Sequence, residues 1–169
     1  MEFVVAQVLG LIALIVVCIG YFLKNKSHFL LAQVIANFFY AGAFLVVDAY
    51  VGTILVTISI FRCIYLYYAE KYDFKYKIHF IPVFLLLYLS MTIVFWNKPY
   101  DFLPLMSSTL FTIGYTLNNM QKMRYILIIP NSILVIYNIL CTTYTSALLD
   151  FIEILVIIIA IVKAMKHKV

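Results

Sequence analysis

The stretch IGYFLKN at residues 19–25 recurs as IGYTLNN at residues 113–119, which is 94 residues further along the chain. Isoleucine, glycine, tyrosine, leucine and the final asparagine keep their places in both copies. The same offset brings Asn37 onto Asn131. Apolar matches arise easily in an apolar chain, whereas shared glycine, tyrosine and asparagine positions do not. The offset therefore predicts an internal repeat.

The composition around this repeat is that of a membrane protein. Of the 169 residues, 66% are hydrophobic and 11% are charged. A soluble domain carries about 45–50% apolar and about 25% charged residues. A globule of this length has too little interior to hide the excess, so the composition excludes an ordinary soluble enzyme and a disordered chain.

Seven apolar runs are each expected to cross the bilayer as a helix. Their residues are continuous rather than alternating, which favours helices over a barrel. The expected helices cover residues 4–23, 29–47, 51–68, 78–96, 102–118, 125–141 and 147–163. Pro104 and Pro130 are expected in the first turns of their helices, where proline is tolerated. The predicted fold is an all-α integral membrane protein, with residues 1–169 as a single membrane domain.

The repeat divides these seven helices into three, one and three. Residues 1–71 form the first three-helix repeat, residues 78–96 a connector helix, and residues 101–165 the second repeat. Because a single connector returns the chain to the side where it began, the two repeats are expected to be parallel. Parallel repeats related by an axis along the membrane normal are typical of some transporters, whose substrate site lies between the repeats near the midplane.

The basic residues predict the orientation. Ten of the twelve fall on one side of the membrane: Lys24, Lys26, Lys71, Lys75, Lys77, Lys122, Arg124, Lys163, Lys166 and Lys168. Lys98 falls on the other side, and Arg62 lies within the third span. The positive-inside rule then places the C-terminus in the cytoplasm and the N-terminus outside. A count of six or eight spans would destroy this asymmetry.

Polar residues within the spans are the candidates for function, because each must find a partner away from water. The candidates for lining a substrate path are Tyr21, Asn37, Tyr115, Asn131 and Asn138. Hydrogen bonding between packed helices is the structural alternative. For the amides the two interpretations stay open, since an amide both donates and accepts and so suits a polar, uncharged solute.

Three charged residues form a second candidate element. Arg62 lies deep in the third span, and the offset places it at a depth similar to that of Glu153, with Asp150 further out. We expect Arg62 to pair with Glu153 or to reach Asp150 across the repeat interface, because an unpaired arginine there would be costly. The pair could fix helix register or take part in substrate or proton handling. Asp150 and Glu153 also share a helix face, which leaves an intramembrane acid dyad as a weaker alternative.

The chain resembles the YgjV family of bacterial inner-membrane proteins over nearly its whole length. The resemblance rests on Phe39-Tyr40-Ala41-Gly42, Arg62, Leu103-Pro104, Arg124, Val135-Ile136-Tyr137-Asn138 and Asp150. It implies a multi-pass protein of the bacterial inner membrane. The helix plan is also similar to that of the SWEET and PQ-loop transporters, although no Pro-Gln dipeptide is present and the repeated asparagine lies on the second helix of each repeat.

Together these features predict a small polar-solute transporter or facilitator that works by alternating access between its repeats. The alternative is a non-transporting membrane receptor, scaffold or accessory protein. No enzymatic activity is expected, since no catalytic or phosphate-binding motif occurs. The expected surroundings are the lipid bilayer and a small polar metabolite, and a homo-oligomer stays open. No nucleic acid, metal or cofactor is expected, and Cys18, Cys63 and Cys141 have no paired spacing.

Overall fold

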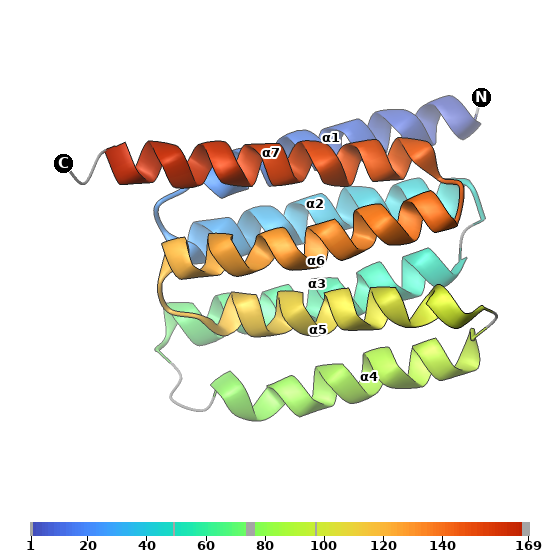
Figure 1. Cartoon of the computed structure of the whole chain (residues 1–169). Helices are drawn as coiled ribbons and strands as arrows, with labels where there is room; N and C mark the ends of the chain where they lie inside the picture. The colour runs from blue at the N-terminus through green and yellow to red at the C-terminus, as the bar shows by residue number, and fades with distance from the viewer. Residues whose placement is uncertain (1, 49, 74–76, 97, 167–169) are drawn as a thin grey trace. The chain divides into compact units, whose positions relative to one another are not determined.

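The computed structural model describes residues 2–48, 50–73, 77–96 and 98–166, and this part of the chain is helical without a strand. Seven α-helices confirm the predicted all-α fold and its helix number (Figure 1). They are α1 (Glu2–Phe22), α2 (Lys26–Val46), α3 (Tyr50–Lys71), α4 (Ile81–Val94), α5 (Phe102–Thr116), α6 (Met120–Leu140) and α7 (Tyr144–Lys166). Short 3₁₀ turns, η1 (Lys77–Phe80) and η2 (Pro99–Asp101), precede α4 and α5.

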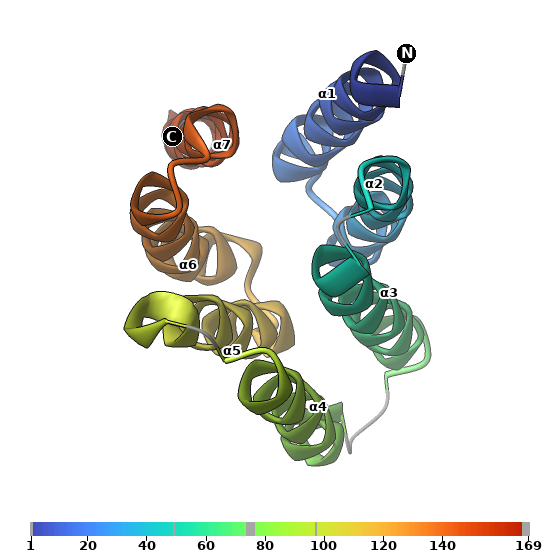
Figure 2. The ribbon, with the colours of Figure 1, turned by 90° about the vertical axis from the view of Figure 1, so that its right-hand side faces the viewer.

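The chain forms two compact units, residues 1–80 and 81–169. In the first unit α2 packs between α1 and α3, as both views of the ribbon show (Figures 1 and 2). In the second unit α6 packs between α5 and α7, and α4 lies against the other side of α5. The helix predicted as a connector thus packs with the second three-helix set.

Four helices among the described residues are long and apolar enough to cross a bilayer: α1, α2, α3 and α6. Helix α4 is a shorter apolar helix of 14 residues. At about 1.5 Å per residue it spans about 21 Å, less than the ~30 Å hydrocarbon core. Helix α7 has 23 residues and carries Asp150, Glu153 and Lys163. The helices bear out an integral membrane protein with several spans.

Asparagine caps explain why two helices begin earlier than predicted. The Asn25 side chain accepts a hydrogen bond from the Ser27 N–H, so α2 begins at Lys26 rather than at residue 29. Asn119 accepts from the N–H groups of Gln121 and Lys122, so α6 begins at Met120 rather than at residue 125. A side-chain oxygen that satisfies these otherwise unpaired N–H groups extends the helix into polar sequence.

The earlier start of α6 overturns the expectation for Pro130. Pro104 lies in the first turn of α5, as predicted, but Pro130 lies inside α6. A proline within a helix has no N–H to donate to the carbonyl four residues earlier. The carbonyl of Pro130 itself accepts a hydrogen bond from the buried hydroxyl of Ser107 on α5, at 3.1 Å, which ties the two helices together.

The two three-helix sets share their helix boundaries at the 94-residue offset. Helices α2 and α6 begin and end 94 residues apart, α3 and α7 begin 94 apart, and α1 and α5 end 94 apart. The caps Asn25 and Asn119 keep the same offset. So do two left-handed residues that follow α2 and α6, Asp48 with φ 55° and Thr142 with φ 60°. Each three-helix set therefore has the same local plan.

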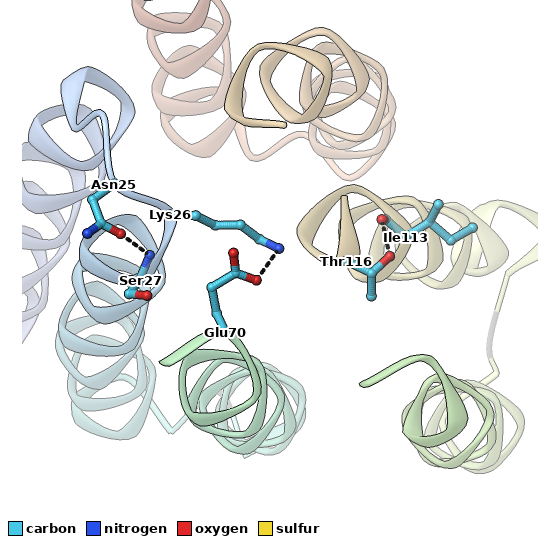
Figure 3. Close-up of polar contacts among 6 residues, drawn as sticks. All are labelled: Asn25, Lys26, Ser27, Glu70, Ile113 and Thr116. Carbon is cyan, nitrogen blue, oxygen red and sulfur yellow. Dashed lines mark hydrogen bonds and ion pairs between the residues drawn. The ribbon is translucent and has the colours of Figure 1, made fainter. Parts of the chain in front are cut away.

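Close helix contacts also recur at this offset. A Cβ placed on Gly20 of α1 would lie 3.1 Å from the Cβ of Ala32 on α2. A Cβ placed on Gly114 of α5 would lie 3.1 Å from Cδ2 of Leu127 on α6. Glycine thus permits the first two helices of each set to approach closely. Just beyond Gly114, α5 ends with the Thr116 hydroxyl donating to the Ile113 carbonyl at 2.7 Å (Figure 3).

Candidate functional site

The repeated amides, Asn37 and Asn131, make the same intrahelical contact. The side-chain N–H of Asn37 donates to the Gln33 carbonyl at 2.8 Å, and that of Asn131 donates to the Leu127 carbonyl at 2.7 Å. Asn131 is only 1% exposed, whereas Asn37 is half-buried. A bond to the carbonyl four residues earlier satisfies one donor of a polar group in an apolar helix. An amide has a second N–H and a carbonyl oxygen beyond this bond.

The repeated tyrosines, Tyr21 and Tyr115, are buried near the ends of α1 and α5. The ring of Tyr21 lies 5.6 Å from that of Phe29 on α2, measured between centroids. The ring of Tyr115 lies 5.8 Å from that of Phe111 on its own helix. These contacts are typical of helix packing. A role in lining a substrate path stays a prediction for both residues.

Asn138 and Asp150 meet between α6 and α7. The side-chain N–H of Asn138 donates to Oδ2 of Asp150 at 2.7 Å. The hydroxyl of Thr143, in the turn between the helices, lies 3.0 Å from both the carbonyl oxygen and Oδ1 of Asn138. Both Asn138 and Asp150 are candidates from the sequence, but neither their contact nor the part of Thr143 was predicted. We call these three residues the Asn138–Asp150 cluster.

The remaining charged candidates lie in separate units. Arg62 on α3 is 4% exposed and lies beside the buried thiol of Cys63. Glu153 on α7 is also buried. A buried charge in an apolar helix requires compensation, which is the reason for expecting them to pair. Their pairing stays a prediction.

An ion pair between Lys26 and Glu70 is a feature that the sequence reasoning missed. Nζ of Lys26, in the first turn of α2, lies 2.9 Å from Oε2 of Glu70, near the end of α3. Figure 3 shows the two side chains pointing toward each other from these helices. The side chain of Lys26 is 5% exposed and that of Glu70 is 22% exposed. We expected Lys26 to be a loop charge, and the Asn25 cap was the signal that places it on α2 instead.

A second basic residue from the expected loops is also buried. Arg124 lies in the second turn of α6, is 4% exposed, and has its guanidinium Nη1 3.4 Å from Oε1 of Gln121. Two further basic residues of the expected cytoplasmic set, Lys75 and Lys168, lie outside the described residues. Two basic residues that were predicted to lie in loops, Lys26 and Arg124, are therefore buried side chains of helices.

The described residues contain no group of three or more histidine, cysteine or acidic side chains placed to hold a metal ion. Cys18, Cys63 and Cys141 form no disulfide with one another. The functional groups that contact one another in the Asn138–Asp150 cluster are an amide, a carboxyl group and a hydroxyl.

These helices define an integral membrane protein with several spans, polar inside at a few positions and apolar on its surface. A family model described as a bacterial inner membrane protein, Imp-YgjV, matches residues 4–168. The chain belongs to this family, which confirms the predicted resemblance and a multi-pass location in the bacterial inner membrane. Comparison with curated proteins and with solved structures gave no match.

Proposed function

We propose that this inner-membrane protein is a transporter or facilitator for a small polar solute, working by alternating access between two three-helix repeats. The observation that supports this proposal is the shared plan of α1–α3 and α5–α7 at a constant offset of 94 residues. Internal repeats of this kind are typical of transporter folds, in which one repeat rocks against the other. Residues 1–71 and 101–165 are the proposed repeats.

The amides Asn37 and Asn131 are the proposed polar contacts for the solute. They occupy equivalent positions in the two proposed repeats and make equivalent bonds within their helices. Each bond holds one N–H of the amide and thereby fixes the direction of the group. The second N–H and the carbonyl oxygen provide one donor and one acceptor to a solute with hydroxyl or amide groups.

The non-transporting alternative, a receptor, scaffold or accessory protein, is favoured by one observation. Asn131 is almost fully buried and its amide bonds its own helix. An amide that serves only to stabilise helix packing would have the same environment. Under this alternative the protein takes up no solute, and replacing both amides would change only the stability of the protein.

An uptake screen separates the two functions. The protein is reconstituted into phospholipid vesicles, and uptake of radiolabelled sugars, amino acids and polyols is compared with that of empty vesicles. We expect at least one solute to enter faster with the wild type, and Asn37→Ala with Asn131→Ala to lower that rate at least tenfold. Absence of uptake for every solute class, or unchanged uptake in the double variant, would contradict the proposal.

Ser132→Ala is the matched control for this screen. Ser132 follows Asn131 on α6, is half-buried, and donates to the Ile128 carbonyl at 2.8 Å in the same pattern. The substitution removes an intrahelical bond of the same kind from another face of the helix. We expect its uptake to stay within about twofold of the wild type, since this hydroxyl bonds only its own helix and even hydrogen bonds between membrane helices average only about 0.6 kcal/mol. A loss as large as that of the amide variant would point to general destabilisation.

A further inference from the structure

The Asn138–Asp150 cluster places a carboxyl group within an apolar helix, bonded to a neutral partner. Asp150 is the seventh residue of α7, which corresponds to a depth of about 9 Å along the helix at about 1.5 Å per residue. Its neighbours in sequence are Leu149 and Phe151. Among the described residues Asp150 makes no ion pair, and its partner, Asn138, is a neutral amide. A carboxylate in such surroundings costs much more than a carboxylic acid.

The turn between α6 and α7 fixes the direction of the Asn138 amide. The backbone N–H of Thr143 donates to the Asn138 carbonyl at 2.8 Å, and that of Thr142 donates to the Ile139 carbonyl at 3.0 Å. This is the Schellman arrangement, which requires a left-handed residue after the helix. That residue is Thr142, at φ 60°, where a β-branched side chain is strained. The Thr143 hydroxyl, within 3.0 Å of Oδ1, then orients the amide so that Nδ2 faces Asp150.

None of the other described titratable groups at this end of the second unit makes a hydrogen bond or an ion pair with Asp150. On α6, the ring of Tyr137 packs against Tyr100 of η2, with centroids 6.3 Å apart, and Cys141 hydrogen-bonds Tyr137.

The charged groups near this end of the unit have contacts of their own. Asp101 of η2 accepts a hydrogen bond from the backbone N–H of Lys98. The ammonium of Lys98 lies 5.4 Å from the Tyr100 ring centroid, and its hydrogen bond with Tyr100 raises the pKa of Lys98. On α7 itself the nearest acid is Glu153, one turn further on.

We propose that Asp150 is a proton-binding site, with Asn138 as the residue that positions it. In the ionised state Oδ2 accepts a hydrogen bond from the Asn138 side-chain N–H. On protonation, a proton from hydronium bonds to Oδ1 and leaves a water molecule, the group becomes a neutral carboxylic acid, and Oδ2 keeps the Asn138 donor as its carbonyl oxygen. Release of the proton to water reverses the step, so that no other bond is made or broken.

A site that exchanges a proton inside an apolar helix changes its charge without changing its hydrogen-bond partner. Under the proposed transport function, on which this part of the inference rests, proton binding at Asp150 couples solute movement to a proton gradient. The first unit has Phe44 and Val56 at the equivalent positions, 94 residues earlier. The proposed coupling site therefore belongs to the second unit.

Infrared difference spectroscopy tests proton binding without any solute. The full-length protein in vesicles of phosphatidylethanolamine and phosphatidylglycerol is titrated with acid, and the carboxylic-acid C=O band is recorded. We expect a band that is absent from Asp150→Asn and retained, at a shifted frequency, in Asp150→Glu. Asp101→Asn, which removes a carboxyl group of η2 outside the α-helices, should keep it. Circular dichroism of each variant checks that helical content is unchanged.

Two results overturn the proposal. One is a carboxyl band in Asp150→Asn equal to that of the wild type, and the other is a wild-type carboxyl band that does not shift in Asp150→Glu. Coupling is then measured with a pH dye inside the vesicles during uptake of the solute found in the screen. Wild type should acidify the lumen and Asp150→Asn should not. A protonation band in vesicles that take up no solute would contradict the transport function and leave the proton site supported.

Discussion

The two three-helix sets share a backbone plan but differ in the polar contact that joins their last two helices. In the first unit α2 and α3 are joined by the Lys26–Glu70 ion pair. In the second unit α6 and α7 are joined by the hydrogen bond from Asn138 to Asp150. The equivalent positions in the other unit, 94 residues away in sequence, hold apolar residues. They are Met120 and Ala164 for the ion pair, and Phe44 and Val56 for the hydrogen bond.

Because each polar contact occurs in only one unit, the shared plan does not depend on either contact. The two sets have equivalent helix boundaries, helix caps and glycine contacts. The polar contacts also lie at opposite ends of their helix pairs, since Lys26 begins α2 whereas Asn138 lies near the end of α6. Features shared by the units are therefore expected to govern folding, and features found in one unit are the better candidates for function.

The largest effect on stability is expected from Glu70→Ala, which removes the carboxylate that pairs with the buried ammonium of Lys26. Removing one member of a buried pair costs about 3–5 kcal/mol, and the partial exposure of Glu70 favours the lower end, about 3 kcal/mol. Lys26→Met with Glu70→Ala gives the first unit the residues of the second at these positions and should recover most of the loss. Thermal unfolding in detergent, followed by circular dichroism, measures both. A double variant no more stable than Glu70→Ala alone would contradict this account of the pair.

A smaller effect is expected at the glycine contacts, and it should differ between the units. Gly20→Ala places a methyl group against the Cβ of Ala32, which is fixed to its helix, so a loss of about 1–2 kcal/mol is expected. Gly114→Ala meets the movable end of the Leu127 side chain at 3.1 Å and Cγ2 of Ile126 at 3.3 Å, so its loss should be smaller than that of Gly20→Ala. The better helix propensity of alanine, up to about 1 kcal/mol, offsets part of the loss at both positions. The same unfolding assay should rank Gly20→Ala below Gly114→Ala. The opposite order would contradict the claim that the contact with Ala32 is more rigid than the contact with Leu127.

The two helix caps should have similar effects in both units. Asn25→Ala and Asn119→Ala each remove an acceptor for N–H groups at a helix start, and such a loss costs about 1 kcal/mol. Asn119 accepts from two N–H groups rather than one, so its loss should be slightly larger. Chemical unfolding of each variant provides the comparison. No measurable loss for either variant would be evidence against a common capping role.

The smallest effect concerns the left-handed residues. Thr142→Gly should stabilise the protein by about 0.5 kcal/mol, because glycine adopts φ near 60° without the strain of a β-branched side chain. Asp48→Gly should change stability less, since aspartate tolerates this conformation better than threonine does. Unfolding midpoints of the two variants give the difference. A gain for Asp48→Gly that exceeds the gain for Thr142→Gly would contradict the strain assigned to Thr142.

The sequence predicts the fold to the extent that apolar runs and repeated polar residues determine it. Seven helices follow from seven runs. The largest errors in helix starts, at α2 and α6, occur where asparagine caps draw polar residues such as Lys26 into a helix, and α3, α4 and α7 differ from their predicted bounds by up to three residues at an end. Asn138 and Asp150 are identifiable as candidates because a polar residue in an apolar helix must find a partner. Their contact with each other depends on how α6 and α7 are rotated about their helix axes. The spacing of residues along one helix does not determine this rotation.

Long-range polar contacts are the part that sequence reasoning missed. Lys26 and Glu70 are 44 residues apart, and only the antiparallel packing of α2 and α3 brings them within 2.9 Å. Their charges also oppose the helix dipoles, since a cation is unfavourable at a helix N-terminus and an anion at a C-terminus. Dipole preferences therefore disfavour a lysine at the start of α2 and a glutamate near the end of α3. The ion pair between the two helices compensates for this unfavourable placement.

Accessibility of single cysteines tests the parallel repeat most directly. After Cys18, Cys63 and Cys141 are replaced, a membrane-impermeant thiol reagent is applied to whole cells and to inverted vesicles carrying Lys24→Cys, Asn118→Cys or Val47→Cys. Two parallel repeats predict that Lys24→Cys and Asn118→Cys are both labelled from the cytoplasmic side and that Val47→Cys is labelled from the outside. Labelling of Lys24→Cys and Asn118→Cys from opposite sides would contradict the parallel arrangement and, with it, the proposed alternation between two equivalent repeats.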